Sequence, residues 1–318
     1  MKLINYIYLA IATIIWAFAP ALVKLSLNDI DPYYFLFIRF LIVSLLCLPY
    51  LILVILKKKF SSYDFKNIII YSLSGQVSLL LYFKGLDLTT STDTIILSLI
   101  GPLLTIAAGH YFFYEKLNFN KKVGITLSFI GALLVVIEPL ISSTNGTAKD
   151  RLSGNLLVFC STIIGTFWVV YSKFLFGKNS NKFISFSKRI GLKLHKKKYE
   201  DVDFNIFSFY IAFLFMLPFY VYNFNFYNEL TLNLSSTSLG VILYMAVFSS
   251  IIAYILYIKA QKALEVTEVS LLAYISPIFS LPASFLILNE VPTLSAFMGL
   301  FIIFSGILIA EFSKNKAK

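Results

Sequence analysis

The sequence has little charge and much apolar surface. Charged residues make up 14% of its 318 positions, whereas hydrophobic residues make up 58% and the mean hydropathy is +0.82. A soluble domain of this size could bury a large core, but it could not hide this much apolar surface from water. The composition therefore excludes a soluble globular protein and predicts that a lipid bilayer is the solvent.

Cysteine and histidine are also scarce, at two residues each. Cys47 and Cys160 fall in the middle of apolar stretches, where they resemble small apolar residues more than a disulfide or a metal site. His110 has no cysteine or carboxylate beside it in sequence, and His195 belongs to a basic tract. We therefore predict no metal and no cofactor.

Catalytic patterns are missing as well. The sequence shows no nucleophile–base pairing, no glycine-rich phosphate loop and no paired carboxylates, so we predict that the protein is not an enzyme. The sixteen acidic residues are expected in loops or at helix ends, with Glu138 the most nearly buried. Proton-driven pumps commonly use an intramembrane carboxylate, so this distribution favours a facilitator or an exchanger.

Long apolar runs are what the sequence does have, and they predict an all-α integral membrane protein. A spanning helix needs ~20 mostly apolar residues, and the runs are continuous rather than alternating, unlike barrel strands. The first run contains Trp16, Pro20 and Lys24 and has no small-residue cleavage site, so it is not read as a signal peptide. The ten predicted spans cover 4–25, 33–56, 67–85, 91–114, 121–142, 153–176, 203–225, 237–260, 267–289 and 293–313.

The net charge of +11 is unevenly distributed along the chain. With ten spans both termini share one side, and most lysines and arginines fall in the loops assigned to it. The other side is assigned only five basic residues, which are Lys84, Lys149, Arg151, Lys259 and Lys262. This positive-inside pattern predicts cytoplasmic termini and argues against a nucleic-acid partner. Abundant Lys, Ile, Asn, Tyr and Phe indicate an AT-rich genome and favour a prokaryotic inner membrane.

An internal repeat is the most informative feature of the chain. At a constant offset of 175 residues, the following positions match: Tyr82-Phe83-Lys84 with Tyr257-Ile258-Lys259, Pro102 with Pro277, Glu115 with Glu290, Gly124 with Gly299 and Gly131 with Gly306. Five spans per copy mean that the second copy enters the membrane in the opposite sense. We therefore predict an inverted repeat of residues 1–145 and 150–318, joined by a polar linker.

A basic insert interrupts the second copy at about 177–202. Earlier in the chain the offset is smaller, since Lys24 pairs with Lys173. Within the insert, Phe183, Phe186, Ile190 and Leu194 share one helical face among cations, which predicts an amphipathic helix on the anionic cytoplasmic leaflet. A solvated linker is the alternative.

These motifs together resemble the EamA-like family of the drug/metabolite transporter superfamily. The resemblance rests on Trp16 to Lys24, on Asp31-Pro32 and Arg39-Phe40, and on the repeated "Pro, then Glu, then two glycines" endings. It implies ten helices in two inverted halves around a central cavity lined by helices one, three, four, six, eight and nine. It also implies a carrier of small metabolites, often an exporter of amino acids or related compounds. In the second copy Gly165 stands where the family pattern has a tryptophan, and Trp168 follows three residues later.

Charged residues near the spans are candidates for gating or for structural pairing. Arg39 could anchor a substrate carboxylate, form an ion pair with Asp29 or Asp31, or extend to the headgroups; we favour the architectural pair. Lys84 and Lys259 are predicted at the external mouth. Glu115 and Glu290 are predicted to end helices four and nine at the cytoplasmic face, as paired structural elements.

Two prolines are the best sequence indicators of the cavity. Pro102 and Pro277 are expected inside helices, where each would free a carbonyl one turn earlier, near Ser98 and Ala273. A kink needed only for packing explains them equally well. The other cavity candidates are polar or aromatic: Trp16, Gln76, Thr94, Ser98, Trp168, Tyr171, Tyr254 and Tyr274.

The sequence thus predicts a membrane transporter that moves small metabolites by alternating access. A lipid or polyprenyl-carrier flippase is the first alternative, and an intramembrane transferase that would depend on His110 and Glu138 is the second. The expected partners are a small-molecule substrate and anionic lipid headgroups, and a homodimer is left open. The identity of the substrate does not follow from the sequence.

Overall fold

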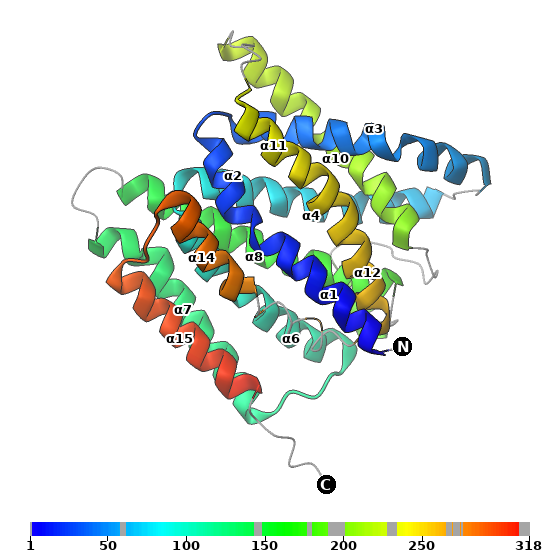
Figure 1. The fold of residues 1–318 in the computed structure, drawn as a ribbon. Coiled ribbons are helices and arrows are strands. Elements are labelled where there is room, and N and C mark those ends of the chain that lie inside the picture. The colour runs from blue at the N-terminus through cyan, green and yellow to red at the C-terminus, as the bar shows by residue number, and fades with distance from the viewer. Residues whose placement is uncertain are drawn as a thin grey trace.

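The computed structural model is built of helices throughout the part of the chain that it describes (Figure 1). That part comprises residues 2–57, 62–142, 148–176, 180–189, 201–227, 234–264, 269, 274 and 276–311. Eight helical segments are long and apolar enough to cross a membrane, and two shorter apolar helices cover Ser276–Leu288 and Leu294–Ala310. The all-helical membrane class is therefore confirmed, whereas the ten-helix inverted repeat stays a prediction.

The helices of the first half follow the predicted spans closely. They are α1 (Lys2–Ala17), α2 (Ala19–Leu27), α3 (Pro32–Lys57), α4 (Ser62–Leu88), α5 (Ser91–Ser98), α6 (Ile100–Phe113) and α7 (Phe119–Ser142). In the second half they are α8 (Ala148–Phe176), α9 (Asn181–Arg189), α10 (Asp201–Tyr227), α11 (Ser236–Tyr244), the π-helix η1 (Met245–Ile252), α12 (Ala253–Ala263), α14 (Ser276–Leu288) and α15 (Leu294–Glu311).

Three of the predicted spans are interrupted, and two of the interruptions have a proline close by. α1 and α2 meet at Phe18, two residues before Pro20, while α5 and α6 meet at Leu99, one turn before Pro102. A proline ring collides with the carbonyl four residues earlier and removes a hydrogen bond. The third interruption is η1, where the Ser250 hydroxyl donates to the Met245 carbonyl. Such π segments are frequent at functional sites.

Pro277 was predicted to lie inside a helix, and the structure places it at a helix start. It is the second residue of α14 rather than an interior one, a position where the missing N–H is tolerated. Ala273, the carbonyl that it was expected to free, lies outside the described residues. Pro102 therefore remains the only one of the two with an interrupted helix around it in the described part.

Close packing of α7 against α15 is made possible by small residues. A Cβ on Gly124 would collide with the Gly306 carbonyl, and one on Gly131 would lie 2.9 Å from the Gly299 carbonyl oxygen. Between these contacts, the Ser128 hydroxyl donates to the Ile303 carbonyl at 3.0 Å. Small residues let membrane helices approach closely enough for backbone contact. A similar approach brings α4 against α8, where Gly85 meets Gly154.

Local geometry recurs at the 175-residue offset. Tyr114 and Asn289 have φ of 59° and 55°, and they are the only non-glycine residues with positive φ in the described chain. After each, a glutamate N–H bonds a carbonyl six residues earlier: Glu115 to Gly109 and Glu290 to Ser284, both at 3.4 Å. A left-handed residue just after the last turn is a common way to end a helix. The two copies thus stop their fourth helices in the same way.

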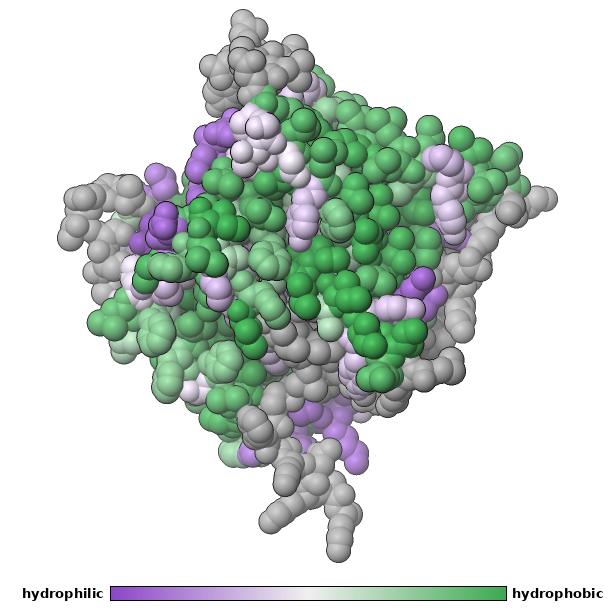
Figure 2. Space-filling model, in the orientation of Figure 1, coloured by the Kyte–Doolittle hydropathy of each residue, from purple (hydrophilic) through white to green (hydrophobic). Residues whose placement is uncertain are grey.

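The outer surface is apolar over most of the visible face (Figure 2). Exposed leucine, isoleucine and phenylalanine side chains occur along most of the membrane-length helices, including Leu45, Ile55, Leu140, Ile163 and Phe301. A soluble protein rarely exposes apolar surface on this scale. The surface fits acyl chains, and the protein is a multi-pass membrane protein.

Two predictions about which residues share a face of the membrane are wrong. Glu290 accepts hydrogen bonds from Thr92 at the start of α5, whereas Glu115 follows the far end of α6, so the two glutamates lie at opposite ends of the bundle. Lys84 likewise contacts Asp87 near the end of α4, while Lys259 lies in α12 near Gln261, at the other end. An odd number of crossings separates each pair, and this puts equivalent positions on opposite faces.

The basic insert forms a helix over its described part, α9. Its phenylalanines face the protein, because Phe183 is 1% exposed and packs with Phe112 and Phe174. The Ser180 hydroxyl also donates to the Phe112 carbonyl, which ties the helix start to α6. The prediction of a helix is confirmed, but Phe183, predicted on the apolar face of a helix at the membrane surface, packs inside the protein. Ile190 and Leu194 lie outside the described residues.

Candidate functional site

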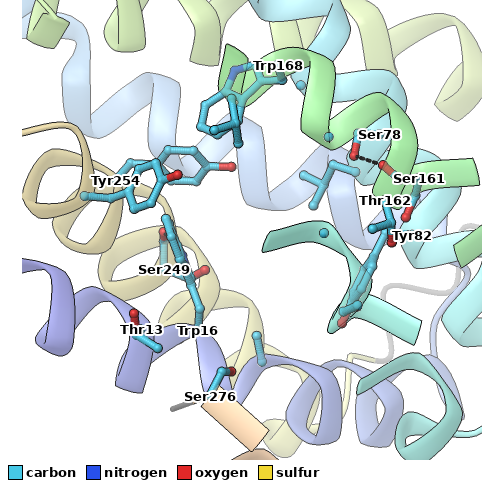
Figure 3. A pocket seen from close by; sticks show the side chains of 18 of the residues that line it. Thr13, Trp16, Ser78, Tyr82, Ser161, Thr162, Trp168, Ser249, Tyr254 and Ser276 are labelled. Atoms are coloured by element: carbon cyan, nitrogen blue, oxygen red, sulfur yellow. Dashed lines mark hydrogen bonds between the residues drawn. The ribbon is translucent and has the colours of Figure 1, made fainter. Parts of the chain in front are cut away.

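A cavity of about 420 Å³ lies inside the helix bundle (Figure 3). Both halves of the chain line it, through α1, α2, α4, α5 and α6 of the first half and α8, η1, α12 and α14 of the second. Arg39 of α3 also borders it. The lining is mostly apolar and aromatic with a few hydroxyl groups, which is the usual make-up of a small-molecule site of this size.

Aromatic rings form one wall of the cavity. Trp16 from α1 packs on Tyr254 and Tyr257 from α12, with ring centroids 5.2 Å and 5.1 Å apart. Trp168 from α8 packs on the same two tyrosines at 5.9 Å and 6.3 Å. The Trp16 indole N–H donates to the Ser249 carbonyl at 3.1 Å, and this bond fixes its orientation beside η1. Both tryptophans of the chain therefore lie on this wall.

The neighbouring part of the wall is built where α4 meets α8. The Ser78 hydroxyl donates to the Ser161 carbonyl at 2.8 Å, and Gly75 lies against the Trp168 ring, which a Cβ added to the glycine would meet at 3.1 Å. Gly165, which replaces the tryptophan of the family pattern, faces Ser78. Since a large side chain at 165 would separate α4 from α8, the glycine keeps these helices together and leaves Trp168 to cover the cavity.

Arg39 is the only charged residue among the described residues that line the cavity. Its side chain is 2% exposed, its Nε donates to the Ser250 hydroxyl at 2.9 Å, and its guanidinium lies over the Phe40 ring. Within the described part of the chain, Nη1 of Arg39 has no hydrogen-bond partner. The expected ion pair is not formed, because Asp29 accepts from Ser235 and Ser238 at the start of α11, and Asp31 contacts Lys84.

A second, much smaller space of about 10 Å³ adjoins the guanidinium. Gln76 and Asn205 border it, and the Gln76 Oε1 and the Asn205 Nδ2 have no hydrogen-bond partner. Tyr71 donates to the other polar atom of Asn205 at 3.0 Å. The space is about the size of one water molecule, and its walls offer both donors and an acceptor. Arg39 therefore stands between the large cavity and a small polar chamber.

The predicted cavity residues divide into three groups. Trp16, Ser98, Pro102, Trp168 and Tyr254 line the large cavity, and Gln76 lines only the small one. The others lie elsewhere: Thr94 donates to the Thr90 carbonyl within α5, Tyr171 donates to Asn67, and Tyr274 and Pro277 are buried away from the cavity.

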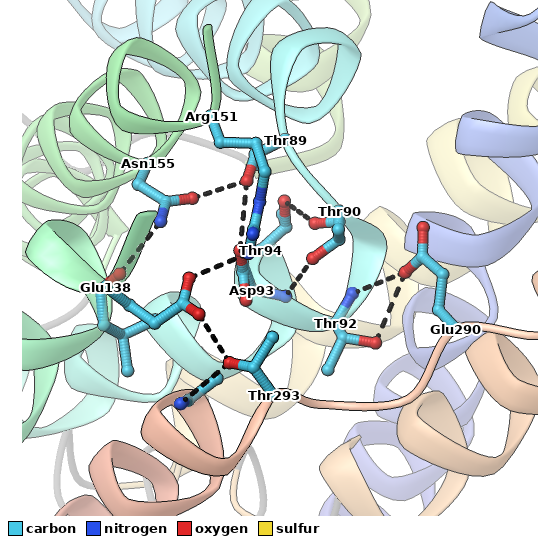
Figure 4. A network of polar contacts seen from close by, with 12 residues as sticks. Thr89, Thr90, Thr92, Asp93, Thr94, Glu138, Arg151, Asn155, Glu290 and Thr293 are labelled. Carbon is cyan, nitrogen blue, oxygen red and sulfur yellow. Dashed lines mark hydrogen bonds and ion pairs between the residues drawn. The ribbon is translucent and has the colours of Figure 1, made fainter. Parts of the chain in front are cut away.

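A buried ionic network closes one end of the bundle, which we call the Asp93 end (Figure 4). Arg151 of α8 lies 2.7 Å from Asp93 of α5 and 2.9 Å from Glu138 of α7. Glu138 also accepts from Thr293, just before α15, at 2.6 Å. The carboxylates are 3% and 0% exposed, so one guanidinium joins two buried anions and four helical segments meet here.

Sequence reasoning missed most of this network. Arg151 was expected in a loop but lies in α8. Asp93 was expected at the start of a span and lies in the first turn of α5, whose N-cap Thr90 accepts from the Asp93 N–H at 3.0 Å. A threonine followed three residues later by an acid is a capping signal. That signal agrees with the start of the helix. It could not have shown that Arg151, 58 residues away, is its partner.

One lysine in each half binds the carbonyls at the end of a neighbouring helix. At the Asp93 end, Lys24 donates to the Leu86 and Asp87 carbonyls at 2.9 Å and 2.8 Å. At the opposite end, which we call the Lys173 end, Lys173 donates to the carbonyls of Gln261 and Leu264 at 3.1 Å and 2.6 Å. Cations are favourable at helix C-termini, whose last carbonyls lack partners.

Comparison with known proteins agrees with this architecture. The family model for the EamA-like transporter family matches residues 3–137 and 152–312. An archaeal protein from Archaeoglobus fulgidus, named "Uncharacterized transporter", is 25% identical over 98% of this chain and 99% of its own length. The protein named "Uncharacterized transporter YoaV" from Bacillus subtilis is 22% identical over 96% of each chain.

A solved crystal structure shares the fold, with a TM-score of 0.61 and 14% sequence identity over 99% of this chain and 98% of the other. The similarity to these relatives extends over almost the full length of the chain and so includes both halves. The apolar helices and the central cavity are what such a protein needs. The chain belongs to the EamA-like transporter family and is a multi-pass membrane transporter.

Proposed function

We propose that this transporter moves small organic metabolites across the inner membrane of the cell by alternating access, with both termini in the cytoplasm and net export. The observation that carries the proposal is the cavity of about 420 Å³, which is lined by helices of both halves. Its volume falls in the usual range for sites that bind small molecules.

The inverted repeat is part of this proposal. It is supported by the reciprocal glycine contacts, since Gly124 meets the equivalent of Gly131, and Gly131 meets the equivalent of Gly124. A two-fold relation produces reciprocity of this kind. Lys24 and Lys173 repeat one interaction at opposite ends of the bundle. Two halves related in this way can rock around a fixed central site.

The transport proposal includes no covalent step. The hydroxyl groups of Ser98 and Thr162, which border the cavity, donate to carbonyls within their own helices. Binding and release therefore rest on shape, aromatic contact and charge. The two halves, 1–145 and 150–318, would act as the moving bodies, with α7 and α15 as the tight crossing between them.

Flux of labelled small solutes into or out of liposomes that contain the purified protein tests the proposal. Thr162 borders the cavity, whereas the next residue, Ile163, is 47% exposed on the lipid side of α8. We expect Thr162→Trp to abolish flux by filling the cavity and Ile163→Trp to retain it. Absence of flux for a broad solute panel with folded protein would contradict the proposal.

A lipid or polyprenyl-carrier flippase stays the alternative function. The exposed cations Lys188 and Arg189 at the end of α9 are suited to anionic headgroups. Scrambling of a labelled lipid, measured in the same vesicles as solute flux, separates the two functions. Solute flux without scrambling supports the metabolite carrier, and scrambling without solute flux supports the flippase.

A further inference from the structure

We propose that the cavity selects solutes that carry an anionic group, such as a carboxylate, and that Arg39 is the residue that selects them. This inference rests on the proposed carrier function and names its substrate class. It starts from an imbalance of charge. Arg39 is the only ionised side chain among the described residues of the cavity wall, and it is 2% exposed.

The surroundings of Arg39 leave its positive charge uncompensated. Among the described residues, its one hydrogen bond goes to a neutral hydroxyl, that of Ser250, and its guanidinium makes a cation–π contact with the Phe40 ring. Asp29 and Asp31, the nearest acids in sequence, are engaged at the start of α11 and with Lys84. A buried charge without a counter-ion is costly, and intramembrane cations nearly always have a partner.

The unpartnered atoms around Arg39 also favour an anion over a cation. Nη1 of Arg39 and Nδ2 of Asn205 are donors without an acceptor, and both residues border the small chamber. Only the Gln76 Oε1 adds an unpartnered acceptor there. In a water-poor site of low dielectric constant, the field of the guanidinium acts strongly on any charge in the adjoining cavity. A carboxylate gains from this field, an ammonium group loses, and a neutral solute is unaffected.

Ser250 holds the guanidinium in this position. Its hydroxyl accepts from Arg39 and donates to the Met245 carbonyl inside η1. An ordinary α-helix offers a hydroxyl the carbonyl four residues earlier, whereas this bond reaches five residues back. The π segment therefore orients Ser250 toward α3, and Ser250 is a positioning residue for the charge.

The two tryptophans provide a direct measure of binding, because both line the cavity and the chain has no others. Small carboxylates, including phenylacetate, 3-methylbutanoate and N-acetyl amino acids, are titrated against the purified protein, each beside its primary amide of nearly the same shape. We expect each acid that changes tryptophan fluorescence to bind at least about tenfold more tightly than its amide.

Variants then assign the preference to Arg39. Arg39→Gln should remove the difference between acid and amide, and Arg39→Lys should retain part of it. Arg189→Gln is the matched control, since Arg189 is exposed on α9 away from the cavity, and it should leave the preference unchanged. Ser250→Ala should weaken the preference without removing it.

The inference is overturned if amides bind as tightly as acids to the unmodified protein, a comparison that needs no variant to fold. It is also overturned if folded Arg39→Gln keeps the preference for acids, since Arg39 would then be a structural residue only. Flux of neutral or cationic solutes without a preference for acids would reject this inference and leave the carrier function intact. No response and no flux for any solute would reject both.

Discussion

At the Asp93 end of the bundle, the Arg151 guanidinium joins carboxylates from two other helices, whereas at the Lys173 end the Lys173 ammonium group binds carbonyls at the end of α12. Both ends share the lysine-to-carbonyl contact, made by Lys24 in one case and by Lys173 in the other. The repeat thus supplies the same basic contact twice, and the Arg151 ion pairs are an addition at the Asp93 end.

This difference bears on how the protein would alternate. Opening the Asp93 end requires the Arg151 guanidinium to separate from two buried carboxylates. Breaking a buried ion pair is costly because it leaves charges without partners. Loss of the Lys173 contacts at the other end would leave neutral carbonyl groups without that donor, not buried carboxylates without a counter-ion. We therefore expect the larger barrier at the Asp93 end, and the following substitutions test this comparison.

The largest effect is expected from Arg151→Ala. It leaves Asp93 and Glu138 buried without a counter-ion, which should cost about 3–5 kcal/mol of stability. The melting temperature in detergent measures the loss. Lys149→Ala, two residues away at an exposed position, is the control and should change little. Adding Asp93→Asn and Glu138→Gln to Arg151→Ala should recover much of the loss. An unchanged melting temperature for Arg151→Ala would show that the network does not hold this end.

A smaller effect on stability is expected where α7 packs against α15. Gly124→Ala places a methyl group against the Gly306 carbonyl of α15, and such overpacking typically costs about 1–3 kcal/mol. Gly240→Ala is the matched control, because a Cβ there meets nothing within 4 Å. Thermal unfolding of the two variants gives the comparison. Equal stability of both would contradict the close backbone contact between α7 and α15.

The smallest effect is expected from Lys24→Met and Lys173→Met. These two substitutions distinguish the two ends of the bundle. Each removes two hydrogen bonds from a charged donor at one end, so each should shift the conformational equilibrium by about 1–3 kcal/mol, in opposite directions. Thr162→Cys, in a chain with Cys47 and Cys160 replaced by serine, reports how accessible the cavity is from each membrane face.

An impermeant maleimide, applied to one membrane face at a time, should label Cys-substituted position 162 faster from the Asp93 end in Lys24→Met. In Lys173→Met it should label faster from the Lys173 end. Faster labelling from the same face in both variants would contradict the assignment of the two lysines to opposite ends. The unsubstituted lysines in the same cysteine background supply the reference rates.

Much of the fold was predictable, and the site was predictable only in part. Trp16, Pro102 and Trp168 were singled out from residue type and position, and they border the cavity. Thr94 and Tyr171 were singled out by the same reasoning, yet they face other helices. A polar residue in an apolar segment is recognisable in sequence, but the rotation of its helix decides whether it faces the cavity or a neighbour.

The sequence by itself determined that lipid is the solvent, where the chain crosses it, and that the chain repeats with an offset of 175 residues. These properties are local and additive, because each segment of ~20 residues partitions according to its own side chains. Only the tertiary structure decided that Arg39 has no carboxylate beside it among the described residues and that Arg151 has two. Such pairing depends on how helices far apart in the chain pack and rotate, and no single segment contains that information.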